Sequence, residues 1–586
     1  MCGIIGYKGN KNPVETVFKG LKRMEYRGYD SWGIACPTDE GIKCFREVGS
    51  ISQVPKELSL EKTRVAISHT RWATHGQVCH ENAHPHISCD GSIAVVHNGI
   101  IENYLELKKM LTEKGYVFKS QTDTEVIAHL IEENYDGNLP EAVRKTAKML
   151  KGSYSVIAIN KDSDQMVGIR NESPLVVGLN GDEYFLSSDV TAFLEHTNQV
   201  KHVDDGEMIV VQSQPVIKKI INGEVVEKET HTINWNIEQA AKGEYEHFML
   251  KEIHEQPEVL RQTLRQNKAK LERVARLAHG APRVCIVAAG TSRHAALVGR
   301  YIMSELTHTY CEVYMASEFQ YFVDKLGKDT LILAVSQSGE TADVLVPVKQ
   351  AKKKGSKVVS IVNVMGSSLD RESDVTLHLN CGPEISVAST KAFTSQVTMF
   401  YLLSYTMRYQ FDKGMEKLSE IPQKIQDTIE LNEEQCVEIA DYMREKEDVY
   451  FIARGENFAV ATEGALKMKE ISYIHAEGMP AGELKHGTLA LIEEDTPVIA
   501  ICPKDHTYEE TLSNVHEAKA RGAHIIGISD KPNDLFDEWL RIPDVDYIFY
   551  PLLANIPCQL LAYYTAVAKG RNVDKPRNLA KSVTVK

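Results

Sequence analysis

RVCIVAAG, residues 283–290, is an apolar run that ends in small residues, and two similar runs follow, TLILAVSQS at 330–338 and KVVSIVNV at 357–364. A second set has the same order, with DVYFIARG from 448, TPVIAICP from 496 and AHIIGISD from 523. The starts lie 47 and 27 residues apart in the first set and 48 and 27 in the second. Because every run is apolar throughout, each fits a parallel strand that is buried on both faces. The repeat therefore predicts two doubly wound α/β domains, offset by 165 residues.

The composition is that of a globular chain with several domains. Its 586 residues are too many for one hydrophobic core, and its net charge of −14 opposes a nucleic-acid-binding surface. The eleven cysteines include no CxxC pair, which argues against a disulfide framework. No apolar run approaches the roughly 18 residues of a membrane-spanning helix, and the N-terminus has no signal pattern. We therefore expect a cytoplasmic protein with no nucleic-acid or membrane partner.

The first 240 residues follow a different pattern. Short β-like runs at 65–68, 93–96, 155–159 and 207–211 alternate with turns and with helical periodicity, as at 124–131. This mixture predicts a layered α+β domain. The polar, helix-like stretch that follows reads as a connector. The predicted division is thus an N-terminal domain (1–240), a linker (241–280), two α/β domains (281–425 and 440–570) and a C-terminal tail (571–586).

The cysteine at position 2 is a candidate nucleophile. Once Met1 is removed, Cys2 carries both a thiol and a free α-amine. An α-amine has a pKa of about 8, so it can be neutral near physiological pH and accept the proton of its own thiol. If Met1 is retained, the amine is part of a peptide bond and this chemistry is lost. A cysteine in second place can also be accidental.

Two further segments of the N-terminal domain place polar groups directly after an apolar run. They are RWATHG at 71–76 and HNG at 97–99. Asn98 and Gly99 offer a side-chain amide and a backbone N–H, which are the donors of an oxyanion hole. The same dipeptide is also typical of an ordinary β-turn.

One cluster resembles a metal site by composition only. Its members are Cys79, His80, His84, His86 and Cys89. Their spacing matches no standard zinc pattern, and the proline at 85 suits a loop better. We expect neither a metal nor another cofactor.

The second predicted strand of the first α/β domain ends in a hydroxyl-rich turn. Such a turn lies at the carboxyl edge of the sheet, where α/β domains bind ligands, and the next helix directs N–H groups at an anion. The side chains suited to a phosphate are Ser336, Gln337, Ser338 and Thr341. Thr291 and Ser292 end the preceding predicted strand and would face the same pocket. Serine and threonine also begin helices without any ligand.

Lys467 and Glu470 stand three residues apart on a predicted helix of the second α/β domain, hence on one face. They form either an exposed ion pair or an acid–base couple. His486, in the segment GELKHG, can titrate near neutrality, although single histidines are usually just packed or exposed.

Eleven motifs occur along the whole chain in a fixed order. They are MCGIIG (1–6), EYRGYDSWGIA (25–35), HTRWATHG (69–76), NAHPH (82–86), VVHNGIIEN (95–103), TDTEVIAHL (122–130), SQSGETADV (336–344), VASTKAFTSQ (387–396), EGALKMKEISYIHAEG (463–478), GELKHG (482–487) and KPRNLAKSVTV (575–585). Together they resemble the glutamine–fructose-6-phosphate aminotransferase family, the isomerising glucosamine-6-phosphate synthases. The resemblance implies an N-terminal-nucleophile (Ntn) glutaminase domain followed by two sugar isomerase (SIS) domains.

For the first domain, the resemblance implies that Cys2 attacks the carboxamide of L-glutamine with its own α-amine as base. Asn98 and the N–H of Gly99 would hold the oxyanion. Arg71 would pair with the α-carboxylate of the substrate in a fork geometry, and Asp123 with its α-ammonium. The pocket would also be lined by Thr74, His75 and Gly76. The ammonia would travel internally past Trp72, which resembles the gate of the channel in this family.

For the SIS domains, the resemblance implies a Schiff base between Lys581 and the ring-opened form of D-fructose 6-phosphate. Glu470 would move a proton between C1 and C2, Lys467 would assist at the C2 oxygen, and His486 of a neighbouring subunit would open the sugar ring. A homodimer is therefore expected. The sugar phosphate would be bound by Ser336, Gln337, Ser338, Thr341, Thr291, Ser292, Val387 and Ala580.

The departures from the family pattern are small. Thr488 stands where many members have proline, and Cys79 and Cys89 are not part of the pattern. The long glutaminase-domain insert of the eukaryotic type is absent, which suggests the bacterial form. Two alternatives stay open: another Ntn glutamine amidotransferase, and a non-catalytic SIS-type sugar-phosphate sensor. The absence of a pyrophosphate-binding acidic motif argues against a phosphoribosyl-transferring amidotransferase, and the glutaminase partner domain and Lys581 argue against the sensor.

Overall fold

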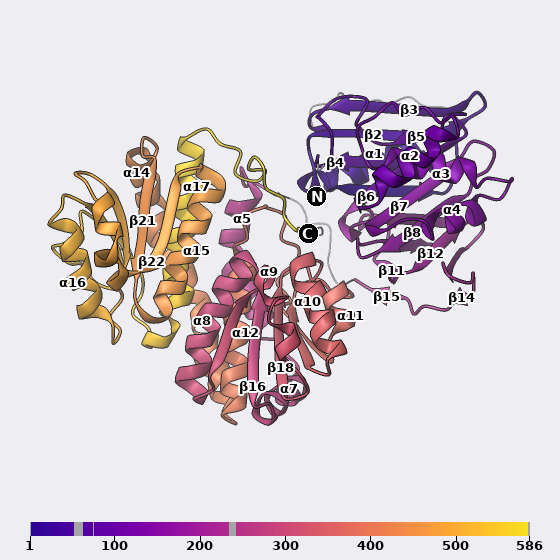
Figure 1. The fold of residues 1–586 in the computed structure, drawn as a ribbon. Helices are drawn as coiled ribbons and strands as arrows, with labels where there is room; N and C mark the ends of the chain where they lie inside the picture. The colour runs from indigo at the N-terminus through magenta and orange to yellow at the C-terminus, as the bar shows by residue number, and fades with distance from the viewer. Residues whose placement is uncertain (1, 52–62, 74, 234–241, 584–586) are drawn as a thin grey trace. The chain divides into compact units, whose positions relative to one another are not determined.

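The computed structural model describes residues 2–51, 63–73, 75–233 and 242–583. The protein folds into two compact units (Figure 1). The first unit comprises Met1–Ala240 with Ala580–Lys586, and the second comprises Ala241–Leu579. Within the described residues, every helix is too short or too polar to cross a lipid bilayer.

The first unit contains two antiparallel sheets. An eight-stranded sheet has the order β15-β11-β9-β10-β1-β4-β2-β3, and a seven-stranded sheet has the order β14-β13-β12-β8-β7-β6-β5. The strands are β1 (Gly3–Lys8), β2 (Ser31–Thr38), β3 (Gly41–Val48), β4 (Val65–Arg71), β5 (His86–Ile87), β6 (Ile93–Ile101), β7 (Gly152–Asn160), β8 (Met166–Asn171), β9 (Val176–Asn180), β10 (Glu183–Ser187), β11 (Gln199–His202), β12 (Glu207–Val211), β13 (Pro215–Lys219), β14 (Val225–Val226) and β15 (His231–Thr232). The α-helices are α1 (Pro13–Arg23), α2 (Tyr104–Glu113), α3 (Glu125–Glu133) and α4 (Leu139–Ala147).

Apolar residues on both faces of each sheet build four layers. Successive side chains of a strand point to opposite faces. Ile4 therefore packs in the core between the two sheets, whereas Ile5 packs with α1 on the outer face of the eight-stranded sheet. Helices α2–α4 cover the outer face of the seven-stranded sheet with a third core. This arrangement confirms the predicted layered α+β fold.

Strand pairing brings distant motifs of the first unit together. Strand β1 pairs antiparallel with β4, so that Gly3 lies opposite Thr70 and Cys2 comes to the end of β4. In the other sheet, β6 pairs with β7, and Gly99 lies opposite Tyr154. The N-terminus and the HNG segment thus belong to different sheets of the same sandwich.

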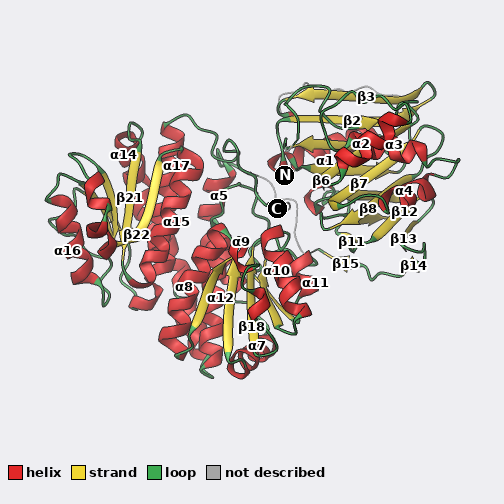
Figure 2. Cartoon of the chain, in the orientation of Figure 1, coloured by secondary structure: helices red, strands yellow, loops and turns green. Residues whose placement is uncertain are grey.

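The second unit contains two five-stranded parallel sheets flanked by helices (Figure 2). Their orders are β17-β16-β18-β19-β20 and β22-β21-β23-β24-β25, the same doubly wound order twice. The strands are β16 (Arg283–Ala288), β17 (Cys311–Met315), β18 (Thr330–Ser336), β19 (Lys357–Val362), β20 (Val375–His378), β21 (Asp448–Ala453), β22 (His475–Pro480), β23 (Pro497–Ile501), β24 (His524–Ser529) and β25 (Glu538–Arg541). The six predicted runs form the three middle strands of each sheet, and the predicted repeat is confirmed.

Thirteen α-helices are present among the described residues of the second unit. They are α5 (Phe248–His254), α6 (Gln256–Thr263), α7 (Lys268–Gly280), α8 (Gly290–Thr307), α9 (Ala316–Phe319), α10 (Ala342–Lys353), α11 (Ser368–Glu372), α12 (Lys391–Met407), α13 (Phe411–Ser419), α14 (Ile421–Met443), α15 (Gly455–Ser472), α16 (Tyr508–Lys519) and α17 (Tyr550–Ala568). The stretch interpreted as a linker forms α5–α7, whose apolar faces belong to a core shared by both sheets. It is helical, as its pattern indicated, but it is part of the second unit.

Helices α8 and α15 are equivalent elements of the two repeats and pack against each other. Each follows the first strand of its repeat, begins at a glycine with positive φ (54° at Gly290, 56° at Gly455) and ends at a left-handed residue, His308 or Tyr473. The two helices have the same length of 18 residues. Their packing joins the carboxyl edge of one sheet to a helix of the other.

Candidate active sites

Cys2 lies against the end of β4, where it contacts the backbone of Trp72. Its Sγ is 3.4 Å from the Trp72 carbonyl oxygen, and the Trp72 N–H donates to Sγ at 3.3 Å. Burial raises the pKa of the thiol, while the Trp72 N–H and the Arg71 guanidinium act in the opposite direction. The thiol is therefore protonated near neutral pH and needs a base before it can attack.

Arg71 is the last residue of β4 and is 3 % exposed. Its guanidinium donates to the carbonyl oxygens of His75 and Gln77, so that the backbone after β4 curls around its head group. Asp30 fixes the same loop, since its carboxylate accepts from the Ala73 N–H at 2.8 Å. The predicted pocket residue Thr74 lies outside the described residues.

Gly76 and His75 complete this loop. Gly76 has a positive φ of 76°, and a Cβ there would meet the Asn82 side-chain amide at 2.8 Å. The ring of His75 packs edge-on against Tyr104, with 5.4 Å between centroids. The loop is thus held from the side of α2 and from the segment that carries Asn82.

Asn98 is buried in β6 with both atoms of its amide lacking a hydrogen-bond partner among the described residues. A buried amide without partners is costly unless a ligand satisfies it. Gly99 follows with a φ of 122°, and a Cβ there would come within 1.9 Å of the Ser153 carbonyl oxygen. Only glycine fits at this position, so no side chain stands next to the backbone N–H of Gly99.

Asp123 lies near the same thiol. Its carboxylate accepts from the Ile101 N–H at 2.8 Å and is 4 % exposed. The negative charge of Asp123 and the positive charge of Arg71 both act on Cys2, with opposite effects on the thiol pKa. The structure therefore brings together a thiol, a cation, an anion and an unpartnered amide. These groups suit an amino acid amide: the cation and the anion match its α-carboxylate and α-ammonium, and the thiol can attack its carboxamide.

The five residues with metal-like composition do not converge. His84 stacks on His69, with 4.0 Å between ring centroids, and also contacts His86. Among the described residues, only Cys89, His129 and Glu132 form a set of three metal-type ligands with all ligand atoms within 4.8 Å of one another. His129 and Glu132 come from α3 and were not part of the sequence pattern.

The hydroxyl-rich turn of the second unit lies at the carboxyl edge of the first parallel sheet. Strands β16 and β18 are parallel neighbours, so Thr291 and Ser292 at the start of α8 come to the same edge as the turn after β18. Within the turn, the Ser336 hydroxyl accepts from the Gly339 N–H at 3.0 Å. Gly339 has a φ of 67°, and a Cβ there would collide with Ser367. The turn is therefore a compact, backbone-lined cradle.

A buried ion-pair network joins this edge to the second repeat. Glu463 of α15 accepts from the Thr291 hydroxyl at 2.9 Å and pairs with His294 Nδ1 at 2.8 Å. Lys467 Nζ lies 3.0 Å from Thr291 Oγ1, 3.3 Å from Glu463 and 2.7 Å from Glu470. Glu463 and Lys467 are both fully buried, so the surface ion-pair interpretation of Lys467 and Glu470 is wrong.

The charge state of Lys467 follows from this network. Burial lowers the pKa of the ammonium, but the carboxylates of Glu463 and Glu470 outweigh it, and the net pKa is raised. Lys467 therefore remains a cation across the physiological range and can donate hydrogen bonds but not accept a proton.

The remaining predicted residues lie on other segments of the chain. Val387 is buried in the loop before α12, and its N–H donates to the Asp574 carbonyl oxygen at 3.3 Å. His486 is exposed at the end of a 3₁₀ turn, Ala481–His486. Ala580 and Lys581 belong to the segment that groups with the first unit. The Schiff-base role of Lys581 stays a prediction from the resemblance.

Comparison with known proteins matches three parts of the chain to two domain families. The family model described as "Glutamine amidotransferase domain" matches residues 69–195, and the one described as "SIS domain" matches residues 278–405 and 442–569. The chain is 47 % identical over 602 aligned residues to a protein of Thermococcus kodakarensis named glutamine–fructose-6-phosphate aminotransferase [isomerizing], with all of both chains covered. A protein of Aquifex aeolicus with the same name is 44 % identical, also at full length.

The chain belongs to the glutamine–fructose-6-phosphate aminotransferase (isomerizing) family. Among solved structures, the C-terminal domain of glucosamine-fructose-6-phosphate aminotransferase from Francisella tularensis is 37 % identical, with a TM-score of 0.54. It covers 57 % of this chain and 99 % of its own length. The predicted family and the predicted Ntn glutaminase and SIS fold are thus confirmed.

Sequence reasoning missed several residues that support the two sites. Arg27 Nε donates to the Cys2 carbonyl oxygen at 3.2 Å and its NH1 pairs with Asp189, while Asp30 holds the loop after β4. Glu463 and His294 build the network around Lys467. Arg27, Asp30 and Glu463 lie inside quoted motifs, which was the available signal; nothing in the sequence marked His294.

The amide of Asn98 gives a stability prediction. Because it has no internal partner, Asn98→Ala should leave the free energy of unfolding of the first unit nearly unchanged. Asn82→Ala is the matched control, since the Asn82 amide donates to the Gln77 carbonyl oxygen at 2.9 Å and accepts from the Gln121 N–H at 2.8 Å. We expect that control to lose about 1–3 kcal/mol in urea unfolding. Equal losses in both variants would mean that Asn98 serves the fold and not a ligand.

Proposed function

We propose that this chain transfers the amide nitrogen of L-glutamine to D-fructose 6-phosphate and isomerises the product, giving D-glucosamine 6-phosphate and L-glutamate. The observation that carries the proposal is that one chain holds a thiol at position 2 beside Arg71 and, in its second unit, a Lys467–Glu470 pair beside Thr291. Neither an isolated glutaminase nor a sugar-phosphate sensor needs both sites. The product is an amino sugar phosphate for amino-sugar synthesis.

In the glutaminase half, Cys2 would attack the carboxamide carbon of glutamine. Since burial raises the pKa of the thiol, the reaction needs a base, and the α-amine of Cys2 itself is the base closest in the covalent structure. Asn98 and the Gly99 N–H would donate to the developing oxyanion. Water then releases glutamate, and the ammonia must reach the sugar before it is protonated. Removal of Met1 is a condition for this chemistry.

In the isomerase half, the Lys581 amine would condense with the C2 carbonyl of the ring-opened sugar, with loss of water. Ammonia would replace the lysine at C2, and Glu470 would carry the proton from C1 to C2 that turns the ketose imine into the aldose amine. Lys467, kept cationic by its two carboxylates, would donate to the oxygen on which charge develops. The turn from Ser336 to Thr341 would bind the phosphate.

The exposure of His486 supports a homodimer. A histidine that opens the sugar ring must touch the sugar, yet His486 is exposed at the end of its 3₁₀ turn. We therefore propose that His486 completes the isomerase site of a second copy of the chain, and that the enzyme works in the cytoplasm.

The thiol can be tested directly. With fructose 6-phosphate and glutamine, the wild-type chain should give glucosamine 6-phosphate and glutamate by mass spectrometry. Cys2→Ala removes the nucleophile and should lower the glutamine-dependent rate by on the order of 10⁴–10⁶, while ammonium salts still support synthesis. Cys79→Ala, at a half-buried cysteine of the same unit without an assigned role, is the control and should keep both rates. Full glutamine consumption by Cys2→Ala would show that the nucleophile is misassigned.

Lys581→Arg tests the covalent step. Arginine keeps the positive charge but cannot form the imine, so aminosugar synthesis should stop while some glutaminase activity survives. Borohydride reduction in the presence of fructose 6-phosphate should add a sugar phosphate to the wild-type peptide that contains Lys581 and leave the variant unlabelled. Lys575→Arg, on the same tail, should behave like the wild type. Product formation at a normal rate by Lys581→Arg would exclude an obligatory imine at this residue.

Glu463→Gln tests the charge of Lys467. With a neutral amide in place of the Glu463 carboxylate, one of the two charges that raise the pKa of Lys467 is removed, and the pKa should fall. Because the cationic form is the active one, ammonia-dependent synthesis should then decline as pH rises, at a lower pH than in the wild type. Glu477→Gln removes an exposed carboxylate of β22 and should not move the profile. An unchanged alkaline limb in Glu463→Gln would separate Lys467 from the reaction.

A further inference from the structure

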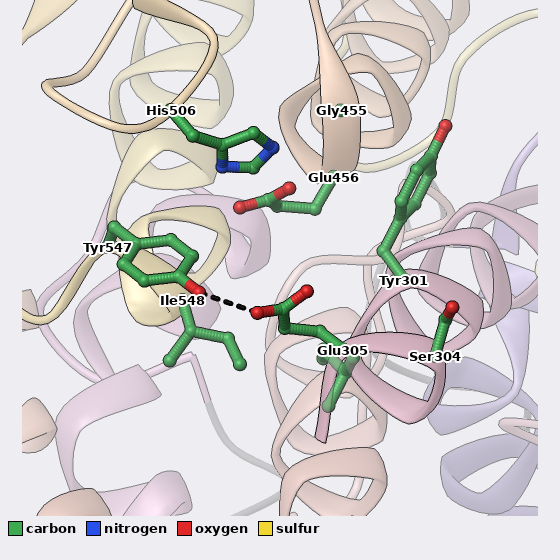
Figure 3. A pocket seen from close by; sticks show the side chains of 9 residues that line it. Tyr301, Ser304, Glu305, Gly455, Glu456, His506, Tyr547 and Ile548 are labelled. Atoms are coloured by element: carbon green, nitrogen blue, oxygen red, sulfur yellow. Dashed lines mark hydrogen bonds between the residues drawn. The ribbon is translucent and has the colours of Figure 1, made fainter. Parts of the chain in front are cut away.

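A second pocket lies at the carboxyl edge of the second SIS sheet, away from the predicted sugar site (Figure 3). Its volume is about 120 Å³, which leaves room for several non-hydrogen atoms. The polar side chains around it are those of Tyr301, Ser304, Glu305, Glu456, His506 and Tyr547. The end of α8, the start of α15, the loop after β23 and the turn before α17 each contribute to the wall.

This pocket lies at the place in the second repeat that is equivalent to the predicted sugar site of the first repeat. Adding 165 to a position in α8 gives the equivalent position in α15, because both helices span 18 residues from an equivalent glycine. Glu305 is therefore equivalent to Glu470, the predicted proton carrier, and Ile302 to Lys467. Glu456 stands where the first repeat has Thr291.

The turn equivalent to the predicted phosphate turn carries different side chains here. The turn 336–341, SQSGET, corresponds to 502–507, CPKDHT, and each segment ends at the residue before its helix. Two hydroxyls and an amide are replaced by a buried thiol, a proline and a lysine. Asp505, in the new turn, accepts hydrogen bonds from Asn457 and Thr507 and adds negative charge. The turn thus keeps one hydroxyl, that of Thr507, and has a carboxylate where the first repeat has Gly339.

Two carboxylates face the cavity instead. Glu456 is 7 % exposed, and its Oε1 has no hydrogen-bond partner among the described residues. Burial raises the pKa of this carboxyl, and the charges of Asp505 and Glu305 raise it further against the effect of His506. Glu305 lies at the mouth, where it accepts from the Tyr547 hydroxyl at 2.8 Å (Figure 3). Both side chains point into the pocket in Figure 3.

The comparison with the sugar site shows which group is absent. There, the ammonium of Lys467 neutralises Glu463 and Glu470 from inside the fold. Here Ile302 occupies the lysine position and is 1 % exposed, and no lysine or arginine among the described residues forms an ion pair with Glu305. A buried carboxylate is stable as an anion only when a cation comes close to it.

We propose that this pocket binds a small protonated amine, whose ammonium group lies between Glu456 and Glu305 in place of the missing lysine. The hydroxyl of Tyr547 and the imidazole of His506 are suited to bind a hydroxyl group on the same ligand. A bare metal ion fits less well, because the ligand atoms of Glu305, Glu456 and His506 do not all lie within 4.8 Å of one another.

Ethanolamine is a suitable probe, since it carries one ammonium and one hydroxyl. Isothermal titration and ligand-observed NMR on the full-length protein, at constant ionic strength, should show saturable binding of ethanolamine. Ethylene glycol, its neutral counterpart, and glycolate, its anionic counterpart, should not bind. Glu456→Gln should weaken ethanolamine binding at least tenfold.

Two further variants guard this test against a folding artefact. Glu305→Gln alters an exposed residue at the mouth, so the fold should tolerate it, and it should also weaken binding. Glu312→Gln is the matched control, because Glu312 also accepts from a tyrosine hydroxyl, Tyr314 at 2.6 Å, but outside the pocket. Its affinity for ethanolamine should equal that of the wild type. No binding by the wild type, equal binding of ethylene glycol, displacement of ethanolamine by stoichiometric Mg²⁺, or unchanged affinity in Glu305→Gln would each overturn the proposal.

Discussion

The packing of α8 against α15 in the second unit depends on the contacts of the Glu463 carboxylate. The carboxylate is fully buried where α8 and α15 meet. It accepts a hydrogen bond from the Thr291 hydroxyl and pairs with His294 and Lys467. A buried ion pair contributes little net stability by itself, but removal of one partner leaves an uncompensated charge. The two SIS repeats are therefore fixed in one register by electrostatics as well as by apolar packing. The same carboxylate decides the protonation of a lysine at the predicted reaction centre.

Burial acts on both predicted sites with opposite consequences. At Cys2 it raises the pKa of the thiol and makes the nucleophile weaker, so that a neighbouring base becomes necessary. At Lys467 it would lower the pKa of the ammonium, yet two carboxylates reverse the effect. The protonation state of each group is thus decided by its surroundings and not by its ordinary pKa. Such shifts are the usual way in which one fold obtains an acid, a base and a nucleophile at neutral pH.

The sequence allows the fold to be predicted where burial is complete. The middle strands of both SIS sheets are apolar throughout, and they were predicted correctly. The edge strands β17 and β22 were not, because CEVYM and HAEGMP are short, mixed in polarity and only partly buried. For the sites, motif order identified Cys2, Arg71 and Lys467. The burial and the contacts of Glu463 could not be predicted, since a glutamate four residues before a lysine gives the same sequence pattern on an exposed helix as on a helix packed against another.

The internal repeat explains why one unit can hold two unlike pockets. A duplicated α/β domain packed against its copy through equivalent helices generates two equivalent edges, each built from the start of one helix and the end of the other. Ile302 stands at the position equivalent to Lys467, so one edge lacks the lysine ammonium of the other. The carboxylate is kept, because Glu305 stands at the position equivalent to Glu470. At the same edge, Cys502, Pro503 and Lys504 replace Ser336, Gln337 and Ser338 of the predicted phosphate turn. Side-chain replacements at equivalent positions therefore distinguish the acidic pocket from the predicted anion site, while the strand order of the two sheets is the same.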